Sequence, residues 1–171
     1  RKGVRRDPLI HGGAQEKRRR AGTENVAGIV GLAKAFELAQ AEREEVTRHL
    51  IQLRDQLLQG LQAIPHTKVN GSLERRLPNN VNVCFQFIEG ESLLLNLDLK
   101  GIAGSSGSAC TSGSLDPSHV LLAMGLSHEI AHGSLRLTLG RENTQDQVTY
   151  VLEEIPIIVE RLRAMSPLYN A

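Results

Sequence analysis

The chain has 171 residues, enough for one sizeable hydrophobic core or two small ones. Lys and Arg number 20 against 19 for Asp and Glu, and this net charge of +1 argues against a protein built mainly to bind nucleic acid or an anionic membrane. Aromatic residues make up only 3% and Trp is absent, so base-stacking platforms are not expected. No apolar stretch approaches the roughly 20 residues of a transmembrane helix.

The chain's two cysteines, Cys84 and Cys110, form no CxxC pair and no disulfide framework. Their spacing favours a reducing compartment, so we expect a cytoplasmic protein. The chain opens with Arg1 and has no apolar stretch near its start. We therefore expect no signal peptide, and we expect the chain to be part of something longer.

The first 64 residues divide into a basic segment and a long helix. Residues 1–22 are rich in Arg and are interrupted by Pro8 and by two adjacent glycines, which predicts an extended or looped segment. Thr23 is a candidate helix cap, and apolar residues then recur every three or four positions until Pro65. One long helix, or two nearly collinear helices breaking near Gln40, is predicted over 23–64 as a connector between domains.

After Pro65 the pattern changes to short elements, which predicts an α+β region over 65–171. Alternating or β-rich runs predict strands near 67–69, 80–87, 102–103 and 134–139. Helical signals predict helices near 93–99, 116–124 and 143–165.

The most unusual stretch is SSGSACTSGS, residues 105–114. A cysteine placed among Gly, Ser and Ala has no apolar wall to pack against, so Cys110 is expected to be accessible on a mobile loop. This placement fits a nucleophile that must travel, and it equally fits a surface loop that happens to contain a thiol. Cys84 lies inside a strand pattern and is interpreted as a packed structural residue.

His128-Glu129-Ile130-Ala131-His132 matches the HExxH pattern, in which two His bind zinc and the Glu activates water. Glu153 and Glu154 are the candidates for a third ligand. The alternative is a short surface helix, because Ser127 resembles an N-cap and Gly133 ends the pattern after one turn.

Two further residues each have two interpretations. Arg136 alternates with leucines on a strand, so its guanidinium either binds a carboxylate or simply covers a solvated face. Thr23 either caps the helix or binds a phosphate at the helix start. The basic run before Thr23 is interpreted as a nucleic-acid contact or as a solvated or subunit-interface face.

These motifs together resemble one family. The run SSGSACTSGS and the following LDPSHVLLAMGLSHEIAHGSLRLTLG resemble the NifS/IscS-type cysteine desulfurases, which are pyridoxal-phosphate enzymes of the class V aminotransferase family and fold type I. The segment HGGAQEKRRRAGTEN at 11–25, PNNVNV at 78–83 and EGES at 89–92 also match that family in order.

The resemblance implies roles for individual residues. Cys110 would take the sulfur of L-cysteine as a persulfide, releasing L-alanine, and Arg136 would bind the substrate carboxylate. Thr23 would contact the phosphate of pyridoxal 5'-phosphate bound in the other subunit of a homodimer. A sulfur acceptor, such as an iron–sulfur scaffold protein, would be the partner, and no metal, nucleic acid or membrane is expected. The HExxH match is then incidental.

The resemblance also implies an α/β fold: the C-terminal part of a fold type I enzyme, with a long connecting helix and a small α+β domain containing a short antiparallel sheet flanked by helices. Residues 1–22 would be a remnant of the large domain, 23–64 the connecting helix and 65–171 the small domain. The family's Schiff-base lysine has no match among the five lysines, so the chain alone is expected to be inactive. The alternatives are a zinc hydrolase, or a non-catalytic interaction or nucleic-acid module.

Overall fold

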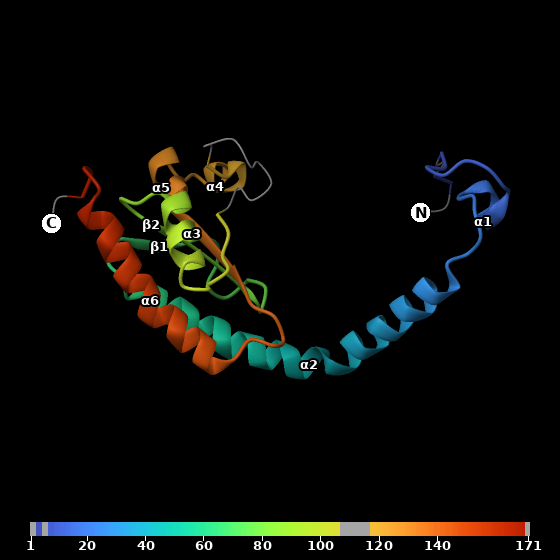
Figure 1. Ribbon diagram of the computed structural model, residues 1–171, viewed down its shortest axis with the longest axis horizontal. Coiled ribbons are helices and arrows are strands. Elements are labelled where there is room, and N and C mark those ends of the chain that lie inside the picture. Colours follow the sequence, from blue (N-terminus) through green and yellow to red (C-terminus); the bar gives the residue numbers. More distant parts are fainter. Residues whose placement is uncertain (1–2, 5–6, 107–116, 170–171) are drawn as a thin grey trace. The chain divides into compact units, whose positions relative to one another are not determined.

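The computed structural model describes residues 3–4, 7–106 and 117–169 (Figure 1). Its contacts divide the chain into two compact units, residues 1–43 and 44–171, which are described separately below. The elements are α1 (Gln15–Arg18), α2 (Val26–Gln62), β1 (Thr67–Val69), β2 (Asn80–Phe85), α3 (Gly90–Asp98), α4 (His119–Ala123), α5 (His128–His132), β3 (Ser134–Thr138) and α6 (Gln145–Ala164).

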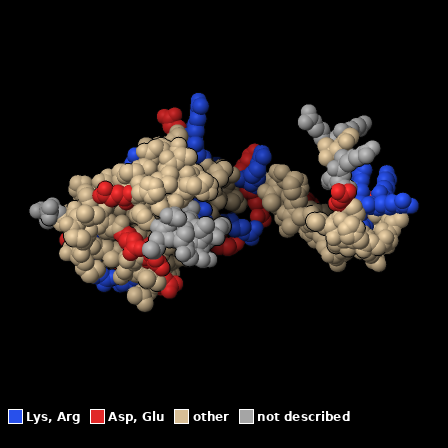
Figure 2. Space-filling model, turned by 90° about the horizontal axis from the view of Figure 1, so that it is seen from above, with Lys and Arg blue, Asp and Glu red and all other residues tan. Residues whose placement is uncertain are grey.

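The first unit contains α1 and the first half of α2. The short α1 turn is unusual because three of its four residues, Glu16, Lys17 and Arg18, have φ of 51°, 56° and 63°, a left-handed conformation that non-glycine residues seldom adopt. Lys and Arg side chains gather in this unit (Figure 2). Along α2 the unit leaves apolar side chains exposed: Val26, Ile29, Val30, Leu32, Phe36 and Leu38.

The second unit is built on a three-stranded antiparallel sheet in the order β1-β2-β3. The register places Val83 opposite both Val69 and Leu135, and Val81 opposite Leu137. Side chains directly opposite one another in an antiparallel pair point to the same face. One face of the sheet is therefore apolar, and it is the face that other elements shield from water.

Helices cover this apolar face. Leucines from the second half of α2, Leu93 and Leu97 of α3, and Ile155 and Ile158 of α6 pack with the sheet valines in one core. Figure 1 shows α6 alongside the second half of α2. The two helices approach closely at Gly60, where an added Cβ would lie 2.5 Å from a methyl carbon of Leu152.

Among the described residues, the opposite face of the sheet is covered only at one end. Buried Cys84 packs there with Leu121, Leu126 and Ala131, which come from α4, α5 and the loop between them. The rest of this face has polar residues from β2 and β3. This uncovered part is where the candidate site lies.

Several predicted boundaries were wrong by a few residues. The strand predicted over 80–87 ends at Phe85, because Phe87 has a φ of 68° that breaks extended structure. No strand forms at 102–103; instead Ser105 makes an isolated bridge. The described part of the helix predicted over 116–124 is His119–Ala123.

The class of fold was predicted correctly: α/β, with a short antiparallel sheet flanked by helices. The last helix begins as its sequence predicts, because Thr144 and Gln147 form a reciprocal capping box. Among the described residues, no helix is both long enough and apolar enough to cross a membrane.

Candidate functional site

Arg136 lies in the middle of β3, between buried Leu135 and Leu137, and its side chain is exposed on the uncovered sheet face. In the described part of the chain, its guanidinium has neither an ion-pair partner nor a hydrogen bond. An unpaired arginine held on a rigid strand can offer its planar fork to a carboxylate. The sequence prediction that Arg136 lies on the polar face is confirmed.

Ser105 is bonded to Arg136 on the outer side of β3. The Ser105 amide donates to the Arg136 carbonyl at 3.0 Å, and the Arg136 amide donates to the Ser105 carbonyl at 2.6 Å. This pair fixes the start of the segment that contains Cys110 to the strand that presents Arg136.

Cys110 itself lies outside the described residues, as do the residues that follow Ser106 up to 116. The expectation of a mobile loop was made for residues 105–114; at its start, Ser105 is instead held to β3 by two hydrogen bonds. For residues 107–114, which lie outside the described residues, it stays a prediction.

Asn82 of β2 is directly opposite Arg136 in the register. The alternation of apolar and polar residues in the sequence identifies Asn82 only as a polar position on a strand. Strand register is a long-range property, and it is the register that brings Asn82 beside Arg136. The sequence pattern alone therefore did not indicate this neighbour.

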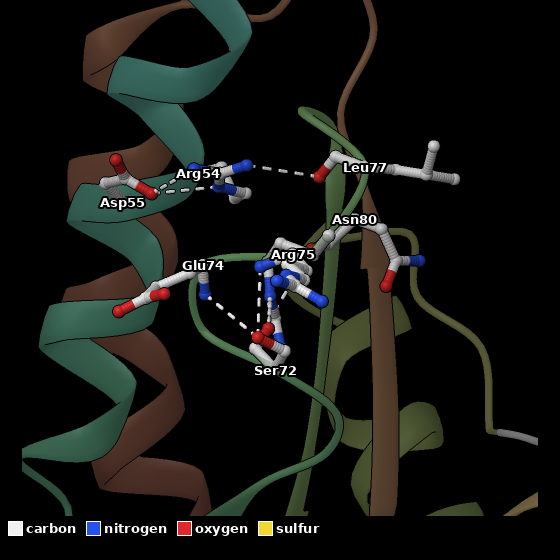
Figure 3. Close-up of polar contacts among 8 residues, drawn as sticks. Arg54, Asp55, Ser72, Glu74, Arg75, Leu77 and Asn80 are labelled. Atoms are coloured by element: carbon white, nitrogen blue, oxygen red, sulfur yellow. Dashed lines mark hydrogen bonds and ion pairs between the residues drawn. The ribbon is translucent and has the colours of Figure 1, made fainter.

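The loop that leads into β2 is fastened at several points (Figure 3). The Ser72 hydroxyl accepts hydrogen bonds from the Glu74 and Arg75 amides at 3.2 and 3.0 Å. Arg54 of α2, whose guanidinium also pairs with Asp55, donates to the Leu77 carbonyl at 3.2 Å. These contacts hold the entry into β2 and so help to fix where Asn82 lies.

Thr23 belongs to the first unit, and its side chain is exposed. The prediction that Thr23 caps the helix was wrong: α2 begins at Val26, and the Asn25 side chain accepts a hydrogen bond from the Gly28 amide at 3.0 Å. The Arg20 guanidinium instead donates to the carbonyls of Gly22 and Thr23 at 2.7 and 3.1 Å. The Thr23 hydroxyl has no partner among the described residues, so it remains available to a phosphate.

The lysines of the described residues do not fit the amine that anchors pyridoxal phosphate. Lys34 pairs with Glu37 at 3.1 Å on the surface of α2, and Lys100 pairs with Glu154 at 3.0 Å. Lys17 and Lys68 are exposed. The described residues therefore include groups suited to a phosphate and to a substrate carboxylate, but no lysine suited to anchor that cofactor covalently.

The HEIAH segment forms α5, a single helical turn. Ser127 caps it by accepting from the Ile130 amide, and it ends at Gly133, as its sequence predicts. Within the described ranges, no group of three or more His, Cys, Asp and Glu side chains lies close enough to hold a metal ion.

Cys84 is fully buried, which confirms its interpretation as a structural residue. Burial raises the pKa of its thiol above the ordinary value of 9.0, while an Asn70 hydrogen bond and the Lys68 charge act more weakly in the opposite direction. A thiol with a raised pKa is a poor nucleophile at neutral pH.

Known proteins resemble the chain over nearly its whole length. A protein named cysteine desulfurase IscS from Methanosarcina thermophila is 66% identical over 168 residues, a match that covers 98% of this chain and 42% of that protein. A protein of the same name from Clostridium botulinum strain Hall is 58% identical over 171 residues, covering 98% and 43%. The chain thus spans about two fifths of the length of these relatives.

The fold is shared with a solved structure titled "NIFS-like protein". That structure has a TM-score of 0.80 and 41% sequence identity, over 95% of this chain and 41% of its own. The expected resemblance to the NifS/IscS-type desulfurases is confirmed. A model of the family described as aminotransferase class-V matches residues 9–151, and the chain belongs to that family.

Proposed function

We propose that this chain is the C-terminal part of a longer cysteine desulfurase, with 1–22 from a large domain, 23–64 as connector and 65–171 as small domain. The names of its relatives and its coverage of about two fifths of their length support this assignment. The exposed apolar side chains on the first half of α2 also support it, because contiguous apolar surface usually marks a face that another part covers.

The proposed reaction transfers a sulfur atom from L-cysteine to Cys110. The Cys110 thiolate attacks the substrate sulfur, an S–S bond forms and the substrate C–S bond breaks, so that L-cysteine and the enzyme thiol become L-alanine and an enzyme persulfide. The observation that most directly supports this proposal is unpaired Arg136, placed on the strand to which the Cys110 segment is bonded. Arg136 would hold the substrate carboxylate.

Pyridoxal phosphate, when bound in the full-length protein, would act as the electron sink for this chemistry. Thr23 would contact its phosphate, in the other subunit of a homodimer, through its free hydroxyl, three residues before α2 begins. The persulfide would pass to a sulfur acceptor such as an iron–sulfur scaffold protein. Cytoplasmic location, expected from the two unpaired cysteines, is part of the same proposal.

The test compares wild-type full-length protein with its Cys110→Ser variant. Wild-type protein is expected to release L-alanine from L-cysteine and to form a persulfide detectable by intact mass. Cys110→Ser is expected to lose persulfide formation while still binding L-cysteine. Cys84→Ser is the matched control, since Cys84 is buried. Wild-type protein that releases no L-alanine, or a Cys110→Ser variant that still forms the persulfide at the wild-type rate, would contradict the proposal.

A further inference from the structure

Four residues form a row across the sheet, perpendicular to the strands. Asn82 is opposite Arg136 in the register, and Ser105 bridges to Arg136 on the other side. Asn70 extends the row beyond Asn82, because its amide donates to the Asn82 carbonyl at 2.9 Å. The order across the face is Ser105, Arg136, Asn82, Asn70.

Arg136 and Asn82 form the kind of pair in which side chains approach most closely. Both backbone groups of Arg136 bond to Ser105, so neither is directed at Asn82. Asn82 and Arg136 are therefore a non-hydrogen-bonded antiparallel pair, in which opposite Cβ atoms lie about 4.5–5.5 Å apart. A ligand bound to one side chain is within reach of the other.

The Asn82 amide is oriented by Asn70. Asn70 is only 7% exposed, and its Nδ2 donates to Asn82 Oδ1 at 2.6 Å and lies 3.1 Å from the buried Cys84 sulfur. Since the Asn82 oxygen is engaged, the group left for a ligand is the Asn82 amino group. In the described part of the chain this amino group has no partner.

This row is the first that the helices leave uncovered. The next row along the strands pairs Cys84 with Ser134, and both are buried, Cys84 under residues of α4 and α5. Asn82 is half-buried and Arg136 is exposed. The Arg136 and Asn82 side chains are therefore both accessible to a small anion at the edge of the covered region.

Arg136 and the Asn82 amino group are both donors and cannot bond to each other, so an acceptor between them satisfies both. We propose that Asn82 donates a second hydrogen bond to the substrate carboxylate that Arg136 binds, and that Asn70 is a positioning residue that orients the Asn82 amide. This inference rests on the proposed function and extends it to two residues of the chain.

The test uses the full-length protein and two ligands that differ in the carboxylate. Asn82→Ala is expected to raise KM for L-cysteine about tenfold with kcat little changed, since it removes one hydrogen bond to a charged group. The inhibition constant of cysteamine, which has no carboxylate, is expected to stay unchanged. The matched control is Asn80→Ala, on the same strand and face one row away, with KM near wild type.

Asn82→Asp distinguishes a hydrogen-bond donor role for Asn82 from a merely structural role. It also provides the test if Asn82→Ala folds poorly. A carboxylate at this position repels the substrate carboxylate, so KM should rise further than in Asn82→Ala. Asn70→Ala should also raise KM, but should add little in the Asn82→Ala background. An unchanged KM in Asn82→Ala, an equal loss for cysteamine, or retained affinity in Asn82→Asp would overturn the inference. Wild-type protein that releases no L-alanine would instead contradict the proposed function.

Discussion

Gly133 lies directly against the backbone of Phe85. The Phe85 amide donates to the Gly133 carbonyl at 2.9 Å, and a Cβ added to Gly133 would lie 2.0 Å from the Phe85 carbonyl oxygen. This contact joins the end of α5 to the end of β2, just before β3 begins. The junction of α5, β2 and β3 therefore has a close backbone approach that leaves no room for a Cβ at position 133.

Replacing Gly133 should make the second unit easier to unfold. Gly133→Ala is expected to lower the free energy of unfolding by at least about 2 kcal/mol, because the new methyl group can be accommodated only if backbone moves. Urea-induced unfolding measures the effect. Gly140→Ala is the matched control, since its Cβ would lie 3.8 Å from the nearest atom, an Asn143 oxygen. Equal stability of the two variants would show that the contact with Phe85 relaxes without cost.

Arg163 should stabilise the second unit through two backbone carbonyls. It is 4% exposed, and it donates to the Gln86 and His66 carbonyls at 3.1 and 3.3 Å. Arg163→Met keeps the length of the side chain but removes the partner of the Gln86 carbonyl, while the His66 carbonyl keeps its hydrogen bond from the Gln86 amide at 3.0 Å. The free energy of unfolding should therefore fall by about 1–3 kcal/mol.

The control for this prediction is Arg161→Met, at an exposed position of the same helix, α6. Arg161 is exposed and contacts the Asn96 side chain, so its loss should change stability by about 0.5 kcal/mol or less. Urea unfolding of both variants gives the comparison. A loss for Arg163→Met as small as that for Arg161→Met would remove the structural role assigned to the buried guanidinium.

Cys84 should make stability depend on pH in the alkaline range. The folded state raises the pKa of the Cys84 thiol above 9.0, so it holds the proton more tightly than the unfolded chain does. The resulting stabilisation is fully present below the unfolded pKa and is lost as pH rises through the folded pKa, at up to about 1.4 kcal/mol per pH unit.

The measurement compares Cys110→Ser protein with the Cys110→Ser/Cys84→Ala double variant by urea unfolding from pH 7 to pH 11. Other alkaline groups titrate in both proteins, so the difference isolates Cys84. The stability advantage of the protein that retains Cys84 should shrink above about pH 9. A difference that is constant across this range would contradict the pKa direction.

The sequence correctly predicted those features whose formation depends on residues close together along the chain. The last helix, predicted over 143–165, begins after Thr144, and the single turn between Ser127 and Gly133 is found where predicted. The start of α2 was misplaced because Thr23 and Asn25 are both good caps, and only the structure shows that Asn25 is used. Propensity alone does not decide between two such residues.

The candidate site was predictable only in part. Arg136 was found because it alternates with leucines on a strand, and Cys110 because its surroundings lack apolar residues. The contacts of Arg136 with Ser105 and Asn82 join residues more than 30 positions apart in the sequence, through strand register. Register is fixed by packing of the whole sheet, which no single segment of sequence specifies.

Arg136 should bind the substrate carboxylate through both arms of its guanidinium. In the full-length protein, Arg136→Ala is expected to raise KM for L-cysteine roughly ten- to a hundredfold, because a charge-assisted bidentate contact contributes on the order of 1.5–3 kcal/mol. Arg136→Lys keeps the charge but loses the fork, so its KM should lie between those of wild type and Arg136→Ala. Steady-state kinetics with L-cysteine and inhibition by cysteamine provide the measurement, with cysteamine expected to be insensitive to both changes. An unchanged KM for L-cysteine in Arg136→Ala would refute the assigned role. It would also be refuted if Arg136→Lys had a KM as high as Arg136→Ala and both variants weakened cysteamine inhibition equally.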